Sequence, residues 1–250
     1  MLGVLDVSTV PWPVMAGLIV MLSAVQSVFG VGLLVFGTPV LLLLGLPFSQ
    51  VLTYLLPCSI TVSALQVATT GGLRLDPMRR RFLVITVPAV VVATVVTLTW
   101  GSPSHIRLVV GAMLIASALL RVASQGTHSR IDTLLKRHQR PLLLLLGLVH
   151  GASNLGGGLL AVLVGGSSQD KNTIRRQIAF CYGAMASMQL LVLFASGDLV
   201  VSATSLLLPL LAAATYLLVG QRAFHQAGQL GYQHALTGMI LGVGLVLVAT

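Results

Sequence analysis

The sequence lacks the charged residues that cover a soluble domain, and it lacks acidic residues inside its apolar segments. Only 8% of the 250 residues are charged and 56% are hydrophobic, whereas a soluble domain carries roughly 25% charged residues. The acidic residues are all aspartates that fall in predicted loops: Asp6, Asp76, Asp132, Asp170 and Asp198. The composition therefore excludes a soluble domain, and it excludes the buried carboxylate relays that are typical of cation-coupled carriers.

Cysteine is also scarce, and the N-terminus lacks the features of a leader peptide. Cys58 and Cys181 lie inside predicted spans without metal-ligand spacing, so we expect apolar packing roles, no metal and no cofactor. Residues 1–13 contain no lysine or arginine, whereas a signal peptide begins with a basic region. We therefore expect that no segment is removed.

Positive charge, by contrast, is in excess, with a net charge of +9. Basic clusters bind nucleic acid in many proteins. Here the arginines lie between hydrophobic segments, where positive charge fixes the orientation of membrane spans. We therefore expect the lipid bilayer, and no nucleic acid, as a partner of this chain.

What the sequence has in abundance is apolar segments of nearly the ~20 residues that cross a hydrocarbon core. The continuous segments are 50–70, 82–100, 106–122, 173–195, 200–219 and 232–249. Two further apolar regions, 14–45 and 141–165, are each interrupted by a glycine motif. The sequence thus predicts an all-α polytopic membrane protein with a single membrane domain, 1–250.

The two interrupted regions occupy equivalent positions in an internal repeat. Alignment of the chain with itself matches Ser27 with Ser153, Gly30 with Gly156 and Gly32 with Gly158. Each unit combines one broken region with three spans. We predict repeat one over 14–123, a cytoplasmic linker over 124–139 and repeat two over 140–250, with the two breaks facing each other.

Each broken region is either one interrupted span or a re-entrant hairpin that returns to the same side. Basic loops are predicted at 71–81, 121–140, 166–176 and 220–231, and positively charged loops stay in the cytoplasm. Hairpins place all of these loops inside, whereas full spans force the last two outside. The hairpin interpretation is therefore favoured. It places both termini outside and inverts the second repeat relative to the first, a transporter plan in which substrate binds at the breaks.

The residue types at the breaks suit an anion. Helices that restart at Leu33 and Leu159 point unpaired N–H groups and the positive end of the helix dipole at the gap. The candidate substrate-binding residues there are glycines, which permit close approach, and neutral donors: Gly30, Gly32, Gly156, Gly157, Gly158, Gln26, Ser27, Ser153 and Asn154. The alternative for the glycines alone is a helix-packing surface.

Other polar residues extend this candidate site. His150 is an ionisable residue inside the membrane and thus a functional candidate; the alternative is a neutral histidine bonded to a backbone carbonyl. The candidates on the following spans are Tyr54, Gln177 and Tyr182, together with Thr53, Ser59 and Gln189. We expect Arg175 and Arg176 to extend to the cytoplasmic edge, or alternatively to gather anions at an inner vestibule.

These motifs resemble those of the sulfite exporter TauE/SafE family. The resemblance covers nearly the whole chain and includes Gly30-Val31-Gly32 followed by Pro39, and His150-Gly151 followed by Gly156-Gly157-Gly158. It implies a bacterial inner-membrane permease that moves sulfite, sulfoacetate or other sulfonates, usually outward, by alternating access. Val31 stands where the family commonly has a run of glycines, so we expect the two halves to contribute unequally.

Three different functions are compatible with parts of the pattern. His150 and Ser153 lie on one helix face, as in an intramembrane acyltransferase or hydrolase, but no carboxylate is near to orient the imidazole. A passive anion channel, or a subunit with only an assembly role, would have the same apolar spans. We expect a homodimer for a carrier this small. The residues leave open which anion is carried, in which direction, and whether a proton accompanies it.

Overall fold

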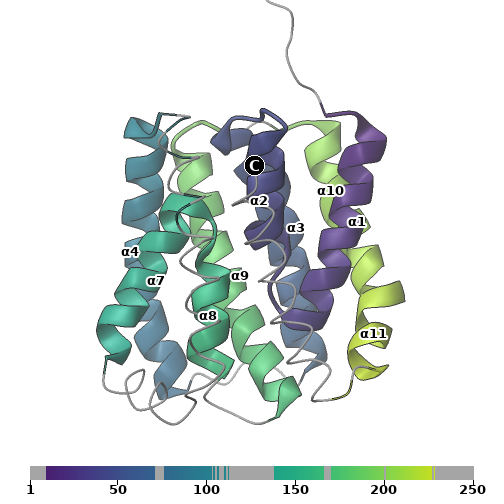
Figure 1. Ribbon diagram of the computed structural model, residues 1–250, viewed down its shortest axis with the longest axis vertical. Helices are drawn as coiled ribbons and strands as arrows, with labels where there is room; N and C mark the ends of the chain where they lie inside the picture. Colours follow the sequence, from purple (N-terminus) through teal and green to yellow (C-terminus); the bar gives the residue numbers. More distant parts are fainter. Residues whose placement is uncertain are drawn as a thin grey trace, which may run out of the picture.

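The computed structural model describes residues 10–70, 76–102, 104, 106, 110, 112, 138–165, 170–199, 201–226 and 228. Every regular element in these ranges is a helix, which confirms the all-α prediction (Figure 1). The elements are α1 (Trp12–Phe29), α2 (Leu33–Leu43), α3 (Phe48–Thr69), α4 (Pro77–Trp100), α7 (Gln139–Ser153), α8 (Gly156–Gly165), α9 (Lys171–Ala195), α10 (Ala203–Thr215), the π-helical turn η1 (Tyr216–Gly220) and α11 (Gln221–Gln226). Most of the predicted span 106–122, all of the span 232–249 and most of the linker 124–139 lie outside the described residues.

Five of the described helical segments are long and apolar enough to cross a membrane, which supports a multi-pass membrane protein. They are Trp12–Phe29, Phe48–Thr69, Pro77–Trp100, Lys171–Ala195 and Ser205–Gln226. The last of these corrects the predicted span 200–219, because the helix continues beyond residue 219 through η1 and α11. Large hydrophobic side chains are exposed on the outer faces, as expected for contact with lipid: Val84, Val92, Leu191, Leu206, Leu210 and Leu218.

The broken regions form two hairpins that open toward opposite ends of the helix bundle. In Figure 1, α1 descends and α2 returns to the top of the view, whereas α7 ascends and α8 returns to the bottom. Gly30 ends α1 with a left-handed φ of 79°, a conformation that glycine adopts without strain. Asn154 ends α7 in the same way with a φ of 66°. These two residues turn the chain.

Helices from the two halves of the chain pack against each other. The hairpin helix α1 lies against α10 and η1, α7 lies against α4, and α3 packs on α9 at the centre. An added Cβ at Gly147 would lie 2.5 Å from the Thr86 carbonyl oxygen, and one at Gly151 would lie 2.5 Å from the Val90 carbonyl oxygen. Glycine at these two positions therefore lets α7 approach α4 closely, as a helix-packing role requires.

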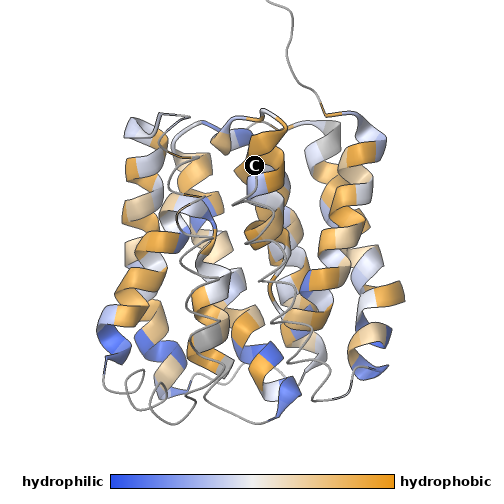
Figure 2. Cartoon of the chain, viewed as in Figure 1, coloured by the Kyte–Doolittle hydropathy of each residue, from blue (hydrophilic) through white to orange (hydrophobic). Residues whose placement is uncertain are grey.

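Hydrophilic residues gather at one end of the bundle, which we call the basic end: the starts of α4, α7 and α9 and the end of α11 (Figure 2). The carboxylate of Asp76 caps α4 by accepting the Arg79 N–H at 2.8 Å. Asp170 caps α9, and hydrogen bonds from the Thr173 hydroxyl and N–H lower the pKa of its carboxyl. Both aspartates thus stand at helix ends rather than inside a span, as predicted.

Candidate functional site

The first break, residues 30–32, is braced by a fully buried glutamine. Gln26 Nε2 donates to the Ser59 carbonyl at 3.0 Å and to Ser63 Oγ at 3.2 Å, which ties α1 to α3. Gln26 Oε1 accepts the Leu33 N–H at 3.2 Å. The first amide of α2, which was expected to face an anion, therefore has a partner within the protein.

Ser27 and Gly32 also serve the structure of this break. Ser27 Oγ donates to the Ser23 carbonyl at 2.6 Å, one helical turn back, so its hydrogen is not available to a ligand. Its carbonyl oxygen accepts Gln66 Nε2 at 3.0 Å and Arg175 Nη1 at 3.2 Å. A Cβ at Gly32 would lie 2.8 Å from the Gln26 backbone nitrogen, so glycine permits the tight return of the chain.

The second break lies between α7 and α8 and differs from expectation in two respects. Its left-handed residue is Asn154, not a glycine; the Asn154 N–H donates to the His150 carbonyl at 2.7 Å. The following helix starts at Gly156, not at Leu159, so Gly156, Gly157 and Gly158 form its first turn. The N–H groups of a first turn have no partner within the helix, and these residues have no side chain to cover them.

The two breaks touch each other. Asn154 Nδ2 donates to Thr38 Oγ1 on α2 at 3.0 Å. An added Cβ at Gly157 would lie 2.6 Å from Val35 Cγ2 and 3.2 Å from Val31 Cγ1. The start of α8 is therefore in van der Waals contact with the first break and the start of α2.

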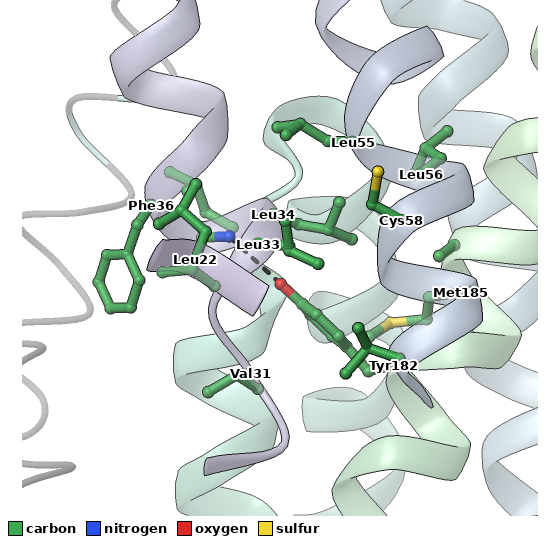
Figure 3. Packing of buried hydrophobic residues seen from close by; sticks show 14 of the residues in the cluster. Leu22, Val31, Leu33, Leu34, Phe36, Leu55, Leu56, Cys58, Tyr182 and Met185 are labelled. Carbon is green, nitrogen blue, oxygen red and sulfur yellow. Dashed lines mark hydrogen bonds between the residues drawn. The ribbon is translucent and has the colours of Figure 1, made fainter. Parts of the chain in front are cut away.

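Tyr182, a predicted site residue on α9, lies between the two breaks. Its hydroxyl oxygen accepts the Val35 N–H at 3.2 Å, at the beginning of α2 (Figure 3). Its ring meets the His150 ring edge to face, with centroids 5.7 Å apart, and a Cβ at Gly157 would lie 3.0 Å from Tyr182 Cε2. The tyrosine hydroxyl thus occupies the position at the start of α2 where the helix dipole favours a negative atom.

His150 is fully buried at the second break and aims at the start of α8. A Cβ at Gly156 would lie 3.0 Å from His150 Nδ1. In the part of the chain that the structure describes, neither ring nitrogen has a hydrogen-bond partner, and the same holds for Asn154 Oδ1 and Gln189 Oε1. The Gln189 side chain lies beside the imidazole, and its Nε2 donates to the His150 carbonyl at 3.2 Å. Buried polar atoms without partners are rare in folded proteins, so this cluster makes the second break a candidate site.

Arg175 corrects the expectation of a side chain that extends to the cytoplasmic edge. Only 1% of the residue is exposed. Its guanidinium donates to the Ser27 carbonyl at 3.2 Å and to the Tyr216 hydroxyl at 3.4 Å, and it lies 3.7 Å from the Phe224 ring centroid. Lys171 Nζ also donates to the Phe224 carbonyl at 3.2 Å. We call Lys171, Arg175, Tyr216 and Phe224 the basic cluster; it joins α9, η1 and α11 to the first break.

The remaining predicted residues are less closely tied to the breaks. Tyr54 and Gln177 are half-buried, on α3 and α9. Ser153 donates to the Val149 carbonyl at 2.7 Å and accepts the Leu155 N–H at 3.3 Å. Thr53 bonds the Ser49 carbonyl of its own helix at 3.0 Å. The serine and threonine hydroxyl hydrogens are thus used by the backbone rather than by the site.

Two glutamines that brace the breaks were hard to identify in the sequence. Gln66 was not among the predicted residues and Gln189 was only a cavity-lining candidate; Gln66 Nε2 bonds the Gln26 carbonyl at 2.9 Å as well as that of Ser27. The Oε1 atoms of Gln66 and Gln189 are both buried, and in the described residues both are unpartnered. Each glutamine thus holds the end of the helix that precedes a break. A polar amide in an apolar helix was the only signal in the sequence.

A cavity of about 270 Å³ lies at the end of the bundle opposite the basic end. Its lining is largely apolar, comes from the ends of α2 and α4 and the start of α3, and includes Asp198 as a charged residue. The cavity does not contain residues of either break. The breaks themselves are closed, because their polar residues Gln26, Ser27, His150, Ser153 and Asn154 are all fully buried.

Comparison with known proteins identifies the family of this chain. The family model described as sulfite exporter TauE/SafE matches residues 15–247, nearly the whole chain. No curated protein and no solved structure matches it. With its apolar spans and its two helix breaks in contact inside the bundle, the chain belongs to the sulfite exporter TauE/SafE family and is a membrane transporter of sulfur anions, not an enzyme.

Proposed function

We propose that this protein exports small sulfur oxyanions, such as sulfite, sulfoacetate or other sulfonates, across the bacterial inner membrane by alternating access. The anion binds where the two helix breaks meet. The observation that carries this proposal is the first turn of α8, where Gly156, Gly157 and Gly158 have no side chain to cover their amides, His150 Nδ1 lies against Gly156, and Gly157 contacts the first break. A helix start that carries such groups offers amides and side-chain atoms to a negatively charged solute.

We propose further that residues 14–123 and 140–250 are inverted repeats joined by a cytoplasmic linker, with both termini on the periplasmic side. The opposite openings of the two hairpins support this relation (Figure 1). So do the reciprocal contacts of α1 with α10 and of α7 with α4. Ser27 and Ser153, which are equivalent in the repeat, each bond the carbonyl four residues back.

Alternating access requires that each side of the site opens in turn. Toward the basic end, the basic cluster holds η1 and α11 against the first break through Arg175 and Ser27. Toward the other end, the bond between Asn154 and Thr38 holds the second break against α2. Separation of the first set of contacts would admit the anion from the cytoplasm. Separation of the second set would release it outside.

The membrane potential provides a driving force in the outward direction. A monovalent anion that leaves a cell with a negative interior gains about 2.3 kcal/mol per 100 mV. Export of such an anion needs no coupling ion, which fits a chain with no Asp or Glu in its predicted spans. Import would need one, and His150 is then the titrating group at the site.

The proposal is tested by flux in proteoliposomes that are loaded with sulfite, sulfoacetate, taurine or sulfate under an imposed potential. We expect saturable flux of a sulfur oxyanion that responds to the potential, without single-channel currents. Unitary currents would indicate a channel. Absence of flux for every one of these anions, in protein that is correctly inserted, would contradict the proposal.

A Ser153→Ala variant separates binding from covalent chemistry. The Ser153 hydroxyl accepts a hydrogen bond from the Leu155 N–H and donates one to the Val149 carbonyl. Its loss should therefore destabilise the second break by about 1 kcal/mol. We expect maximal flux to persist and the KM for the anion to rise less than about tenfold. Flux assays on the reconstituted variant measure both quantities. Complete loss of flux in a well-folded Ser153→Ala protein would indicate that the hydroxyl reacts.

A further inference from the structure

The internal repeat makes the two ends of the helix bundle comparable. The alignment that matches Ser27 with Ser153 also matches α4, Pro77–Trp100, with residues 203–226, which α10, η1 and α11 form together, and it places all of α3 within α9. The start of α3 and the end of α4 lie at the end opposite the basic end, which we call the outer end (Figure 1). The start of α9 and the end of α11 are their counterparts at the basic end.

At the basic end, two large side chains fill the space between these counterparts. The guanidinium of Arg175, near the start of α9, lies 3.7 Å from the ring centroid of Phe224 on α11, and both side chains are buried. An added Cβ at Gly220 would overlap the Ser27 side chain, and the Ser27 carbonyl accepts the guanidinium at 3.2 Å. Arg175 and Phe224 therefore close the space between α9, α11 and the first break.

At the outer end, the equivalent residues are smaller and line a cavity. The same alignment matches Arg175 with Ser49 and Phe224 with Leu98. Ser49 and Leu98 both line the cavity of about 270 Å³. A serine and a leucine take up less space than an arginine and a phenylalanine, so the volume that is filled at the basic end is left open here. The cavity is thus the outer counterpart of the space that Arg175 and Phe224 fill.

The cavity reaches to about one helical turn from the second break. Leu42, which lines it, follows Thr38 by four residues on α2, and Thr38 accepts the hydrogen bond from the second break at 3.0 Å. Leu98 follows Thr94 by four residues on α4, and the Thr94 hydroxyl donates to the Gly151 carbonyl of α7 at 3.3 Å. Four helical residues rise about 6 Å. A thin layer that contains these two buried hydrogen bonds therefore separates the cavity from the second break.

We propose that this cavity is the outer vestibule of the transport path, through which the sulfur oxyanion leaves when the layer at Thr38 and Thr94 opens. This inference rests on the proposed function. The charges at the two ends suit outward passage, because the cation of Arg175 stands at the basic end, whereas the cavity is lined by Asp198. A carboxylate repels an anion, so the cavity serves as a passage and not as a second binding site.

A single cysteine in the cavity tests this assignment. Leu98→Cys, in protein with Cys58 and Cys181 replaced by alanine, is labelled in detergent with a charged, membrane-impermeant maleimide and then reconstituted. Because the adduct fills the cavity, we expect sulfoacetate flux to fall at least about tenfold relative to the unlabelled variant. Val201→Cys, at an exposed position just before α10, should be labelled without loss of flux.

The repeat also predicts a pair of substitutions that closes the vestibule. Ser49→Arg combined with Leu98→Phe places at the outer end the pair of side chains that fills the basic end. We expect the maximal sulfoacetate flux of this double variant to fall at least about tenfold, while gel filtration in detergent reports whether the protein is folded. Ser49→Ala removes the hydroxyl without filling the cavity, and this variant should transport like the wild type.

Labelling of intact cells with the same maleimide reports on which side the cavity opens. We expect Leu98→Cys to react from outside. Reaction only in inverted membrane vesicles, or full flux after complete labelling, would overturn the outer vestibule and leave the transporter intact. Absence of flux for every sulfur oxyanion in the unlabelled wild type would instead overturn the proposed function. Thr97→Cys repeats the test from a second lining position, and both comparisons hold even where the double variant fails to fold.

Discussion

Replacing Gly157 with leucine should sharply reduce transport without preventing membrane insertion. A Cβ at this position would already lie 2.6 Å from Val35 Cγ2 and 3.0 Å from Tyr182 Cε2, so a leucine forces the second break away from the first. Overpacking of this kind costs about 1–3 kcal/mol, and we expect flux to fall at least about tenfold. Flux in proteoliposomes measures the loss, and gel filtration in detergent reports whether the protein remains folded.

Gly17→Leu is the matched control. Gly17 is also a helical glycine, but it is exposed on α1 and an added Cβ would meet nothing within 4 Å. This variant should transport like the wild type. Full activity of Gly157→Leu would show that close contact between the breaks is not needed for transport.

Replacing Arg175 with glutamine should have a second large effect. The guanidinium donates to both the Ser27 carbonyl and the Tyr216 hydroxyl, and hydrogen bonds of charged groups contribute about 1.5–3 kcal/mol each. The substitution removes these bonds together with a positive charge on the proposed path. We expect the KM for sulfite to rise and maximal flux to fall, with flux over KM reduced at least about tenfold.

An Arg175→Lys variant separates the role of the positive charge from the role of the two hydrogen bonds. Lysine keeps the charge but lacks the planar fork that reaches two acceptors, so the KM should stay nearer the wild-type value while maximal flux remains low. Arg80→Gln removes the same charge at an exposed position on α4, and this variant should transport normally. If Arg175→Gln and Arg80→Gln gave the same flux, the basic cluster would have no part in transport.

Much of the fold follows from composition and from the spacing of apolar segments. A chain with 8% charged residues needs helices to satisfy its backbone inside lipid, and the observed starts of α3 and α9 lie within two residues of the predicted ones. The glycine motifs marked both breaks correctly. The left-handed turn at Asn154 was missed because glycine is the commoner choice and three glycines follow closely.

The parts of the site that depend on tertiary contacts had little local signal. Thr38 becomes the partner of Asn154 only because α2 folds back beside α8. Arg175 lies four residues after the start of α9, where a lysine or arginine side chain normally extends to the membrane interface. Its side chain instead points inward, because its guanidinium hydrogen-bonds Ser27 and Tyr216 and packs on the Phe224 ring. Sequence alone places such a residue at an edge, and only the packing of distant helices brings it inside.

Accessibility of a single cysteine at the first break tests most directly whether the anion binds where the breaks meet. Val31 is buried and contacts Gly157. A Val31→Cys variant, with Cys58 and Cys181 replaced by alanine, is treated in proteoliposomes with a methanethiosulfonate reagent that itself carries a sulfonate. Ser196→Cys, at an exposed turn, serves as a position that should react regardless of substrate.

We predict that the cysteine at position 31 reacts, and that sulfoacetate, a sulfonate that does not react with the reagent, slows the reaction about tenfold at ten times its KM through occupancy of the site. The reaction at position 196 should be unaffected. A cysteine at position 31 that reacts at the same rate with and without saturating sulfoacetate, in protein that transports sulfoacetate, would contradict binding between the two breaks.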